Sequence, residues 1–231
     1  SAASVPHAAG QVRVHYPDRA YSTLSYGGSQ WIASPRGLYR YRFDDKVWSA
    51  YGPQNGLLSP QVTSLDVRND VLWIGQRNGM TSFDLRSNTM LHFDSAQGFT
   101  AGAVRATAFE EDYVWTGGSR GAARYDNLIE EWQRISHTEG LTGTNIHAIV
   151  PADDRVFLAT GSAVNEYDPR YERWRSYAPP GDDIVLDAFT AGGWIWLLRE
   201  RDLLRFDTEA RVFSPYPLDG FTGSDIREIA V

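Results

Sequence analysis

Residues 72–84 read LWIGQRNGMTSFD, and a similar arrangement returns four more times along the chain. It consists of an apolar residue, an aromatic residue that we call the anchor, a short loop that usually contains glycine, and a second aromatic residue ten positions after the anchor. The anchors are separated by steps of 42, 42, 42 and 39 residues, at Trp31, Trp73, Trp115, Phe157 and Trp196. A nearly constant step of this length is typical of a chain built from repeated supersecondary units.

Each repeat contains four short runs of β-forming residues. The first run opens eleven residues before the anchor, at Ala20, Val62, Val104, Ile146 or Val185. Turn-forming pairs such as Asn69-Asp70 follow the first run, and loops such as residues 76–79 follow the second. Four hairpin-linked strands in a repeat of this size are typical of a propeller blade. We therefore predict an all-β fold, a β-propeller of four-stranded antiparallel blades, with the five first strands around one axis.

The repeated aromatic residues have a structural explanation. A four-stranded sheet has two apolar faces, and stacking blades face to face buries both of them. The anchors would then lie between blades together with the second aromatics, which are Tyr41, Phe83, Tyr125, Tyr167 and Phe206. Their constant phase favours packing between blades over a platform for stacking sugars.

The two ends of the sequence resemble parts of a further repeat. Residues 11–16 resemble a fourth strand and residues 225–231 resemble a first strand, so we expect five full blades plus strands of a sixth. We assign residues 1–10 to an N-terminal linker or tag and residues 11–231 to the propeller. Either the chain is a piece of a longer protein, which we favour, or the extra strands close the ring irregularly. Because bare edge strands invite pairing, we expect the two to share a sheet or flank one gap.

Composition excludes several classes of partner. The chain carries 22 basic and 29 acidic residues, a formal net charge of -7. Nucleic acids and anionic membranes attract basic surfaces, so we expect no nucleic-acid binding. No apolar run approaches the roughly 18 residues of a membrane helix, so we expect no direct membrane insertion. The absence of cysteine excludes disulfides and thiolate metal sites.

The repeated phrase resembles the two-component regulator propeller repeat. It runs apolar-Trp-Ile-Gly, Gly-apolar, aromatic-Asp and Trp, as in residues 72–84 and 114–126, and it ends in Gly56-Leu57, Gly98-Phe99, Gly140-Leu141 and Gly220-Phe221. The resemblance covers about residues 11–231. It implies an extracytoplasmic sensory module of a bacterial signalling protein such as a hybrid histidine kinase, hence a periplasmic or extracellular location. Phe157 replaces the anchor Trp, and the fifth repeat has lost its glycine, so the last repeats depart from the pattern.

The sequence shows no catalytic or metal-binding motif. None of its five histidines lies in a zinc-binding arrangement, and there is no nucleophile elbow. His147 lies near the expected channel mouth, where it is either a general base or a packed histidine. Acidic pairs such as Asp153-Asp154 fall at turns that favour Asp, whereas Asp182-Asp183 lies in a shortened loop and stays open as a functional pair. We predict no catalytic residue, no metal and no cofactor.

Arginines gather in the loops between second and third strands. In a propeller these loops share one face with the connections between blades, and here they carry Arg36, Arg77, Arg120, Arg199 and Arg201. Near the starts of the first strands lie Tyr21, Arg105, His147 and Arg227. Guanidinium groups suit carboxylate, sulfate or phosphate. We predict an anion-binding rim with Arg36, Arg77 and Arg120 as the main contributors; the alternative is that each arginine pairs with a local Asp or Glu.

These observations favour a non-catalytic module that binds a ligand or a protein on its loop face. The expected partner is an anionic small molecule, a glycan or a protein. One alternative is a propeller-type lyase or hydrolase, which needs histidine and carboxylates converging on the channel. Another is a structural scaffold component of a surface complex. A buried histidine–carboxylate pair would favour the enzyme.

Overall fold

The structure is a computed structural model that describes residues 3–4, 19–99, 101–135 and 140–217. Within these ranges the chain forms five antiparallel sheets of four consecutive strands, which we call blades one to five. A two-residue strand, β1 (Ala3–Ser4), adds to the outer edge of blade two by pairing with its fourth strand. The described residues confirm the predicted fold class, an all-β propeller of four-stranded blades.

The strands alternate with short turns in every blade. Blade one contains β2 (Ser22–Tyr26), β3 (Ser29–Ser34), β4 (Gly37–Arg42) and β5 (Trp48–Tyr51). Blade two contains β6 (Val62–Arg68), β7 (Val71–Gln76), β8 (Gly79–Asp84) and β9 (Thr89–Phe93). Blade three contains β10 (Val104–Glu110), β11 (Tyr113–Gly118), β12 (Gly121–Asp126) and β13 (Glu131–Ile135). Blade four contains β14 (Ile146–Ala152), β15 (Arg155–Thr160), β16 (Val164–Asp168) and β17 (Arg173–Tyr177). Blade five contains β18 (Val185–Ala191), β19 (Trp194–Arg199), β20 (Leu203–Asp207) and β21 (Val212–Tyr216). Two 3-10 turns, η1 (Pro53–Asn55) and η2 (Ser95–Gln97), lie in the connections that precede blades two and three.

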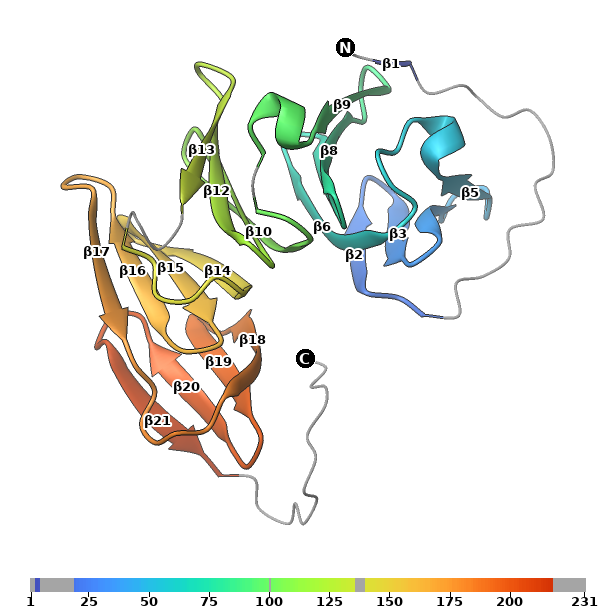
Figure 1. Cartoon of the computed structure of the whole chain (residues 1–231). Coiled ribbons are helices and arrows are strands. Elements are labelled where there is room, and N and C mark those ends of the chain that lie inside the picture. The colour runs from blue at the N-terminus through green and yellow to red at the C-terminus, as the bar shows by residue number, and fades with distance from the viewer. Residues whose placement is uncertain (1–2, 5–18, 100, 136–139, 218–231) are drawn as a thin grey trace.

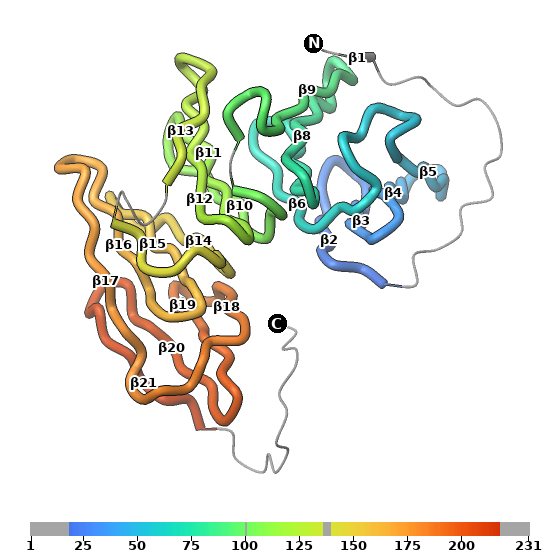
Figure 2. Tube along the Cα trace, in the orientation of Figure 1, coloured from blue at the N-terminus to red at the C-terminus, as the bar shows by residue number. Residues whose placement is uncertain are grey.

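The five blades follow one another in an arc (Figures 1 and 2). Their first strands, β2, β6, β10, β14 and β18, lie on the inner side of the arc, and each contacts the first strand of the next blade. Residues 11–16 and 225–231, the expected strands of a sixth blade, lie outside the described residues.

The first strands begin at the predicted residues in blades two to five and two residues late in blade one. There β2 begins at Ser22, which pairs with Ala33. In blades two and three the residue after the second strand extends this pairing, because the Arg77 and Ser119 N–H groups donate to the Gln61 and Ala103 carbonyls. Blade one has Pro35 at this position, and proline has no N–H to donate.

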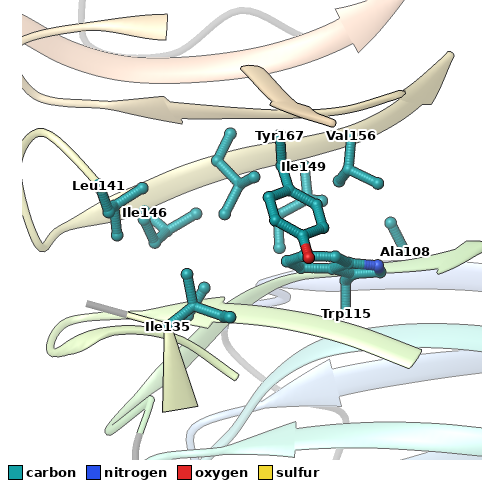
Figure 3. Close-up of a cluster of buried hydrophobic side chains, with 10 residues drawn as sticks. Ala108, Trp115, Ile135, Leu141, Ile146, Ile149, Val156 and Tyr167 are labelled. Atoms are coloured by element: carbon teal, nitrogen blue, oxygen red, sulfur yellow. The ribbon is translucent and has the colours of Figure 1, made fainter. Parts of the chain in front are cut away.

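The core consists of four apolar clusters, one between each pair of consecutive blades. In each cluster an anchor meets the second aromatic of the next blade, with ring centroids 5.4 to 6.2 Å apart: Trp31 with Phe83, Trp73 with Tyr125, Trp115 with Tyr167, and Phe157 with Phe206. Figure 3 shows Trp115 lying under Tyr167, with Ile149 near the two rings and Ile146 farther along, next to Leu141. These aromatics pack between blades as predicted.

The glycine two residues after an anchor allows the next blade to approach. A Cβ atom on Gly117 would lie 2.3 Å from Ile146 Cγ2, and one on Gly75 would lie 2.8 Å from Val104 Cγ1. Both neighbours belong to the first strand of the following blade. Blade five has Leu198 at this position.

Candidate functional site

The loops between second and third strands share one face with the connections between blades. The Arg77 N–H donates to the Gln61 carbonyl at 3.2 Å, and the Arg120 N–H donates to the Ala101 carbonyl at 3.0 Å. Both acceptors lie in connections that precede a first strand. These bonds place the turns of blades two and three on the predicted common face, which we call the loop face.

The loop face is hollowed between blades two and three. The cavity has a volume of about 760 Å³. Its walls come from the turns after β7 and β11, the connection between the two blades, and β13; the lining residues are Arg77, Asn78, Ser95, Phe99, Gly102, Ala103, Ser119, Arg120 and Arg134. We call this cavity the arginine hollow.

Among the described residues, three guanidinium groups and no carboxylate line the arginine hollow. Arg77, Arg120 and Arg134 are all exposed. Across the described ranges none of the three forms an ion pair, although Arg77 Nη1 donates to Gln61 Oε1 at 3.2 Å. The hollow is therefore a concave site whose charged groups, among the residues that the structure describes, are all positive.

The structure brings together only part of the predicted rim. Arg77 and Arg120 reach the same hollow because they come from adjacent blades, whereas Arg36, one blade earlier, is not among the lining residues. Arg199 is 5% exposed and donates to both carboxylate oxygens of Asp202 and to the Pro180 carbonyl, so it fastens its own loop. Arg201 is exposed and lies 3.7 Å from Asp183. For Arg199 and Arg201 the local-pairing alternative describes the geometry.

Arg134 is the residue that the sequence analysis missed. It lies on the fourth strand of blade three, opposite Ala123 of β12, and not in a loop. A search confined to loop arginines cannot find it. The signal was available in the repeat, since the end of a fourth strand leads directly into the connection that lies on the loop face.

The first strands carry a second group of polar residues. Strands β6, β10, β14 and β18 each have a register shift after their first residue, which leaves Arg105 and His147 at bulge positions in blades three and four. Bulges re-aim a side chain and are common beside functional sites. Arg105 is exposed, Tyr21 is 46% exposed under the Arg19 guanidinium, and Arg227 lies outside the described residues.

His147, which is buried, pairs with an exposed carboxylate of the next blade. Its Nδ1 lies 3.2 Å from Asp187 Oδ1, and its Nε2 lies 3.1 Å from Asn145 Nδ2. The side chain of His147 is 3% exposed, and that of Asp187 is 64% exposed. Burial opposes ionisation of Asp187, but hydrogen bonds from His147 and the Ala188 N–H, and the charge of Arg105, lower its pKa.

Asp187 escaped the sequence analysis because of the bulge. His147 is the second residue of its strand and Asp187 is the third, so a search for partners in the same phase misses the pair. The equivalents of Asp187 in the three preceding blades are the small residues Ser64, Ala106 and Ala148. An Asp where the other blades have small residues could have pointed to Asp187 as a candidate partner for His147.

The described ranges show no group of three or more His, Cys, Asp or Glu side chains placed to hold a metal ion. None of their helices has the length and apolar character that crossing a membrane requires.

Comparison with known proteins places the chain by its fold. No protein-family description and no curated protein matches the sequence. Among solved structures, the extracellular domains of two putative hybrid two-component systems from B. thetaiotaomicron superpose with TM-scores of 0.73 and 0.72, at 12% and 13% identity. The matches cover 88% and 95% of this chain but 30% and 32% of those chains, so it spans about a third of their length. Virginiamycin B lyase from Staphylococcus aureus has a TM-score of 0.69 at 10% identity, covering 87% of this chain and 70% of the lyase.

Proposed function

We propose that this propeller is the sensory module of an extracytoplasmic bacterial receptor, located in the periplasm or outside the cell, and that it reads an anionic ligand in the arginine hollow. The observation that carries the proposal is that Arg77, Arg120 and Arg134 converge on a cavity whose described lining includes no carboxylate. The fold shared with extracellular domains of two-component systems supports the receptor context.

Electrostatics explain why the arginine hollow suits an anion. The chain as a whole is acidic, so a site lined by three guanidinium groups is a local reversal of charge. Each guanidinium offers several N–H donors in a fixed plane, which fit carboxylate, sulfate or phosphate oxygens. An exposed contact of this kind contributes about 0–1 kcal/mol, so useful affinity needs all three at once.

The test is a calorimetric titration with sulfate, succinate and oligogalacturonate. We expect the double variant Arg77→Ala/Arg120→Ala to bind the preferred anion about 5- to 30-fold more weakly, from two lost contacts of about 0.5–1 kcal/mol each. Native affinity should also fall as salt is raised, because screening weakens exposed charge pairs.

The matched control is Arg36→Ala/Arg201→Ala, which removes two loop-face arginines that do not line the hollow. It should bind as the native chain does. Equal affinity of both double variants, or binding by neither variant nor native chain, would contradict an anion site in the arginine hollow.

A second candidate function rests on the His147–Asp187 pair, which matches in part the feature expected of the enzyme alternative, because the histidine is buried and the carboxylate is exposed. Since the Asp187 carboxylate can only accept a hydrogen bond, neutral His147 carries its hydrogen on Nδ1 and presents the Nε2 lone pair toward Asn145. If Asn145 moves aside, Nε2 can take a proton from water as the water oxygen bonds to an ester or lactone carbonyl carbon. The same proton then passes to the leaving oxygen as the carbon–oxygen bond breaks.

A panel of esters and lactones tests this candidate. Hydrolysis should be lost in His147→Gln and fall by about 10²- to 10⁴-fold in Asp187→Asn, because an unoriented imidazole is a poor general base. Arg201→Ala should leave the rate unchanged. Absence of hydrolysis by the native chain, or equal rates in all four proteins, would leave His147 as a packed histidine. The scaffold interpretation stays a prediction.

A further inference from the structure

The first strands of blades three, four and five carry unlike charges at neighbouring positions. Arg105 lies at the bulge of β10, His147 at the bulge of β14, and Asp187 directly after the bulge of β18. These three strands are consecutive on the inner side of the arc, and β14 contacts both of the others (Figure 1). A cation and an anion therefore lie on either side of blade four.

The Asp187 carboxylate is held by one oxygen and open at the other. Its Oδ1 accepts from His147 Nδ1 at 3.2 Å and from the Ala188 N–H at 2.9 Å, whereas Oδ2 has no hydrogen-bond partner among the described residues. Burial opposes the ionisation of Asp187, but these two donors and the nearby charge of Arg105 lower its pKa. The side chain is therefore an oriented anion with a free acceptor.

Arg105 supplies the opposite charge. It is exposed, and its guanidinium forms no hydrogen bond or ion pair within the described ranges, so its N–H donors are available. Its charge acts on Asp187 across blade four, although the two side chains do not pair directly. A small molecule that carries both charges can therefore bridge them.

Apolar side chains lie beside the carboxylate on blade five. Leu186 has the bulge position that His147 has in blade four, and it is 44% exposed. Ile184 has the position of Asn145, just before the first strand, and it is 62% exposed. Blade five therefore offers apolar surface next to Asp187 at two positions where blade four is polar.

We propose that Arg105 and Asp187 bind the two charges of a zwitterionic α-amino acid with an apolar side chain. The guanidinium donates to the α-carboxylate, Asp187 Oδ2 accepts from the α-ammonium group, and the ligand side chain lies on Leu186 and Ile184. A zwitterion fits because this site carries both charges, whereas the described lining of the arginine hollow carries only positive charge. The proposal requires neither anion binding in the hollow nor hydrolysis at His147.

The test is a calorimetric titration of the whole chain with L-leucine and two derivatives that each lack one charge. L-leucinamide keeps the ammonium group but has no carboxylate, and N-acetyl-L-leucine keeps the carboxylate but has no ammonium group. The native chain should bind leucine about 3- to 10-fold more tightly than either derivative, as expected of one partly exposed charge contact.

Two variants assign each charge of the ligand to one side chain. Arg105→Gln should weaken leucine binding about 3- to 10-fold and leave leucinamide binding unchanged, because leucinamide has no carboxylate to lose. Asp187→Asn, which keeps an oxygen that accepts from His147, should weaken leucine and leucinamide alike and should not weaken N-acetyl-leucine. The matched control, Arg36→Ala/Arg201→Ala, removes two exposed arginines elsewhere and should bind leucine as the native chain does.

Several outcomes would overturn the proposal. The native chain could bind the three probes equally, or bind no leucine at all. Arg105→Gln could weaken leucinamide as much as leucine, or Asp187→Asn could leave leucine binding unchanged. In each case the two side chains do not read the two charges of the ligand. Arg105→Gln should also bind the preferred anion of the arginine hollow with native affinity, so failure at one site is distinguishable from failure at the other.

Discussion

At the scale of single residues, Asp66 is a carboxylic acid in an environment that disfavours its charge. It lies on β6 opposite Trp73, and burial raises its pKa to about 6, although the Val67 N–H donates to it and acts in the opposite direction. The equivalent residues of blades three and four are Ala108 and Val150. Nearby on the first strands, the hydroxyls of Ser64 and Thr107 have no hydrogen-bond partner within the described structure.

The raised pKa predicts how stability depends on pH. The folded state holds the Asp66 proton up to about pH 6, while the unfolded chain releases it near 4. The folded state therefore binds more protons in this window, and the free energy of unfolding falls as pH rises through it. The free energy of unfolding of Asp66→Asn should equal that of the native chain near pH 4. At pH 7 it should be higher by about 1–2 kcal/mol, after an allowance for partial exposure.

Urea unfolding across this pH range measures the difference. Asp112→Asn, at an exposed turn residue, is the control and should follow the native curve at every pH. Native and Asp66→Asn curves that stay parallel from pH 4 to 7 would show that Asp66 ionises as freely in the folded state as in the unfolded chain.

At the scale of strands, the sequence predicted what the repeat determines and missed what departs from it. The spacing predicted the anchors, the second aromatics and the starts of four first strands. Each of these residues is needed once per blade to fill the space between consecutive blades. Pro35 shortened β2 through a missing N–H, a local effect that repeat averaging hides. Because of the bulges, His147 and Asp187 occupy different positions in their strands. Their pairing could therefore be found only from the structure.

Charged contacts between different blades were also not predicted from the sequence. Glu166 on β16 is 3% exposed, yet it accepts hydrogen bonds from Arg211, in the turn before β21, and from Tyr177. Burial alone would raise the pKa of Glu166, but these two partners outweigh it and lower the pKa. No other blade has an acidic residue at this position. The repeat therefore does not predict an ion pair between blades four and five.

At the scale of the whole molecule, the repeat predicted a propeller with its first strands around one axis, but not which arginines meet in the arginine hollow. Arg77 and Arg120 meet because adjacent blades share a seam, and Arg134 joins them from a fourth strand. Arg36 has the same loop position but belongs to blade one, and the hollow lies between blades two and three. The position of a residue within the repeat therefore predicts the face on which its side chain lies. Which side chains it can meet depends on whether their blades are adjacent.

An arc of blades should also respond to damage locally, because each blade contacts only its neighbours. Trp115 is fully buried between blades three and four, where its Nε1 donates to Glu110. Replacing a buried tryptophan by alanine costs about 3–5 kcal/mol, and in a stacked array the loss falls on the elements that shared the contact. We therefore expect Trp115→Ala to lower hydrogen-exchange protection in β11, β12, β15 and β16 and to leave β3 and β4 close to native. Trp174→Ala, at a partly exposed residue of the outer strand β17, is the control and should cost less and perturb fewer amides. An equal loss of protection in blades one and four would mean that the blades unfold as one cooperative unit, since local opening would then be no easier than global unfolding.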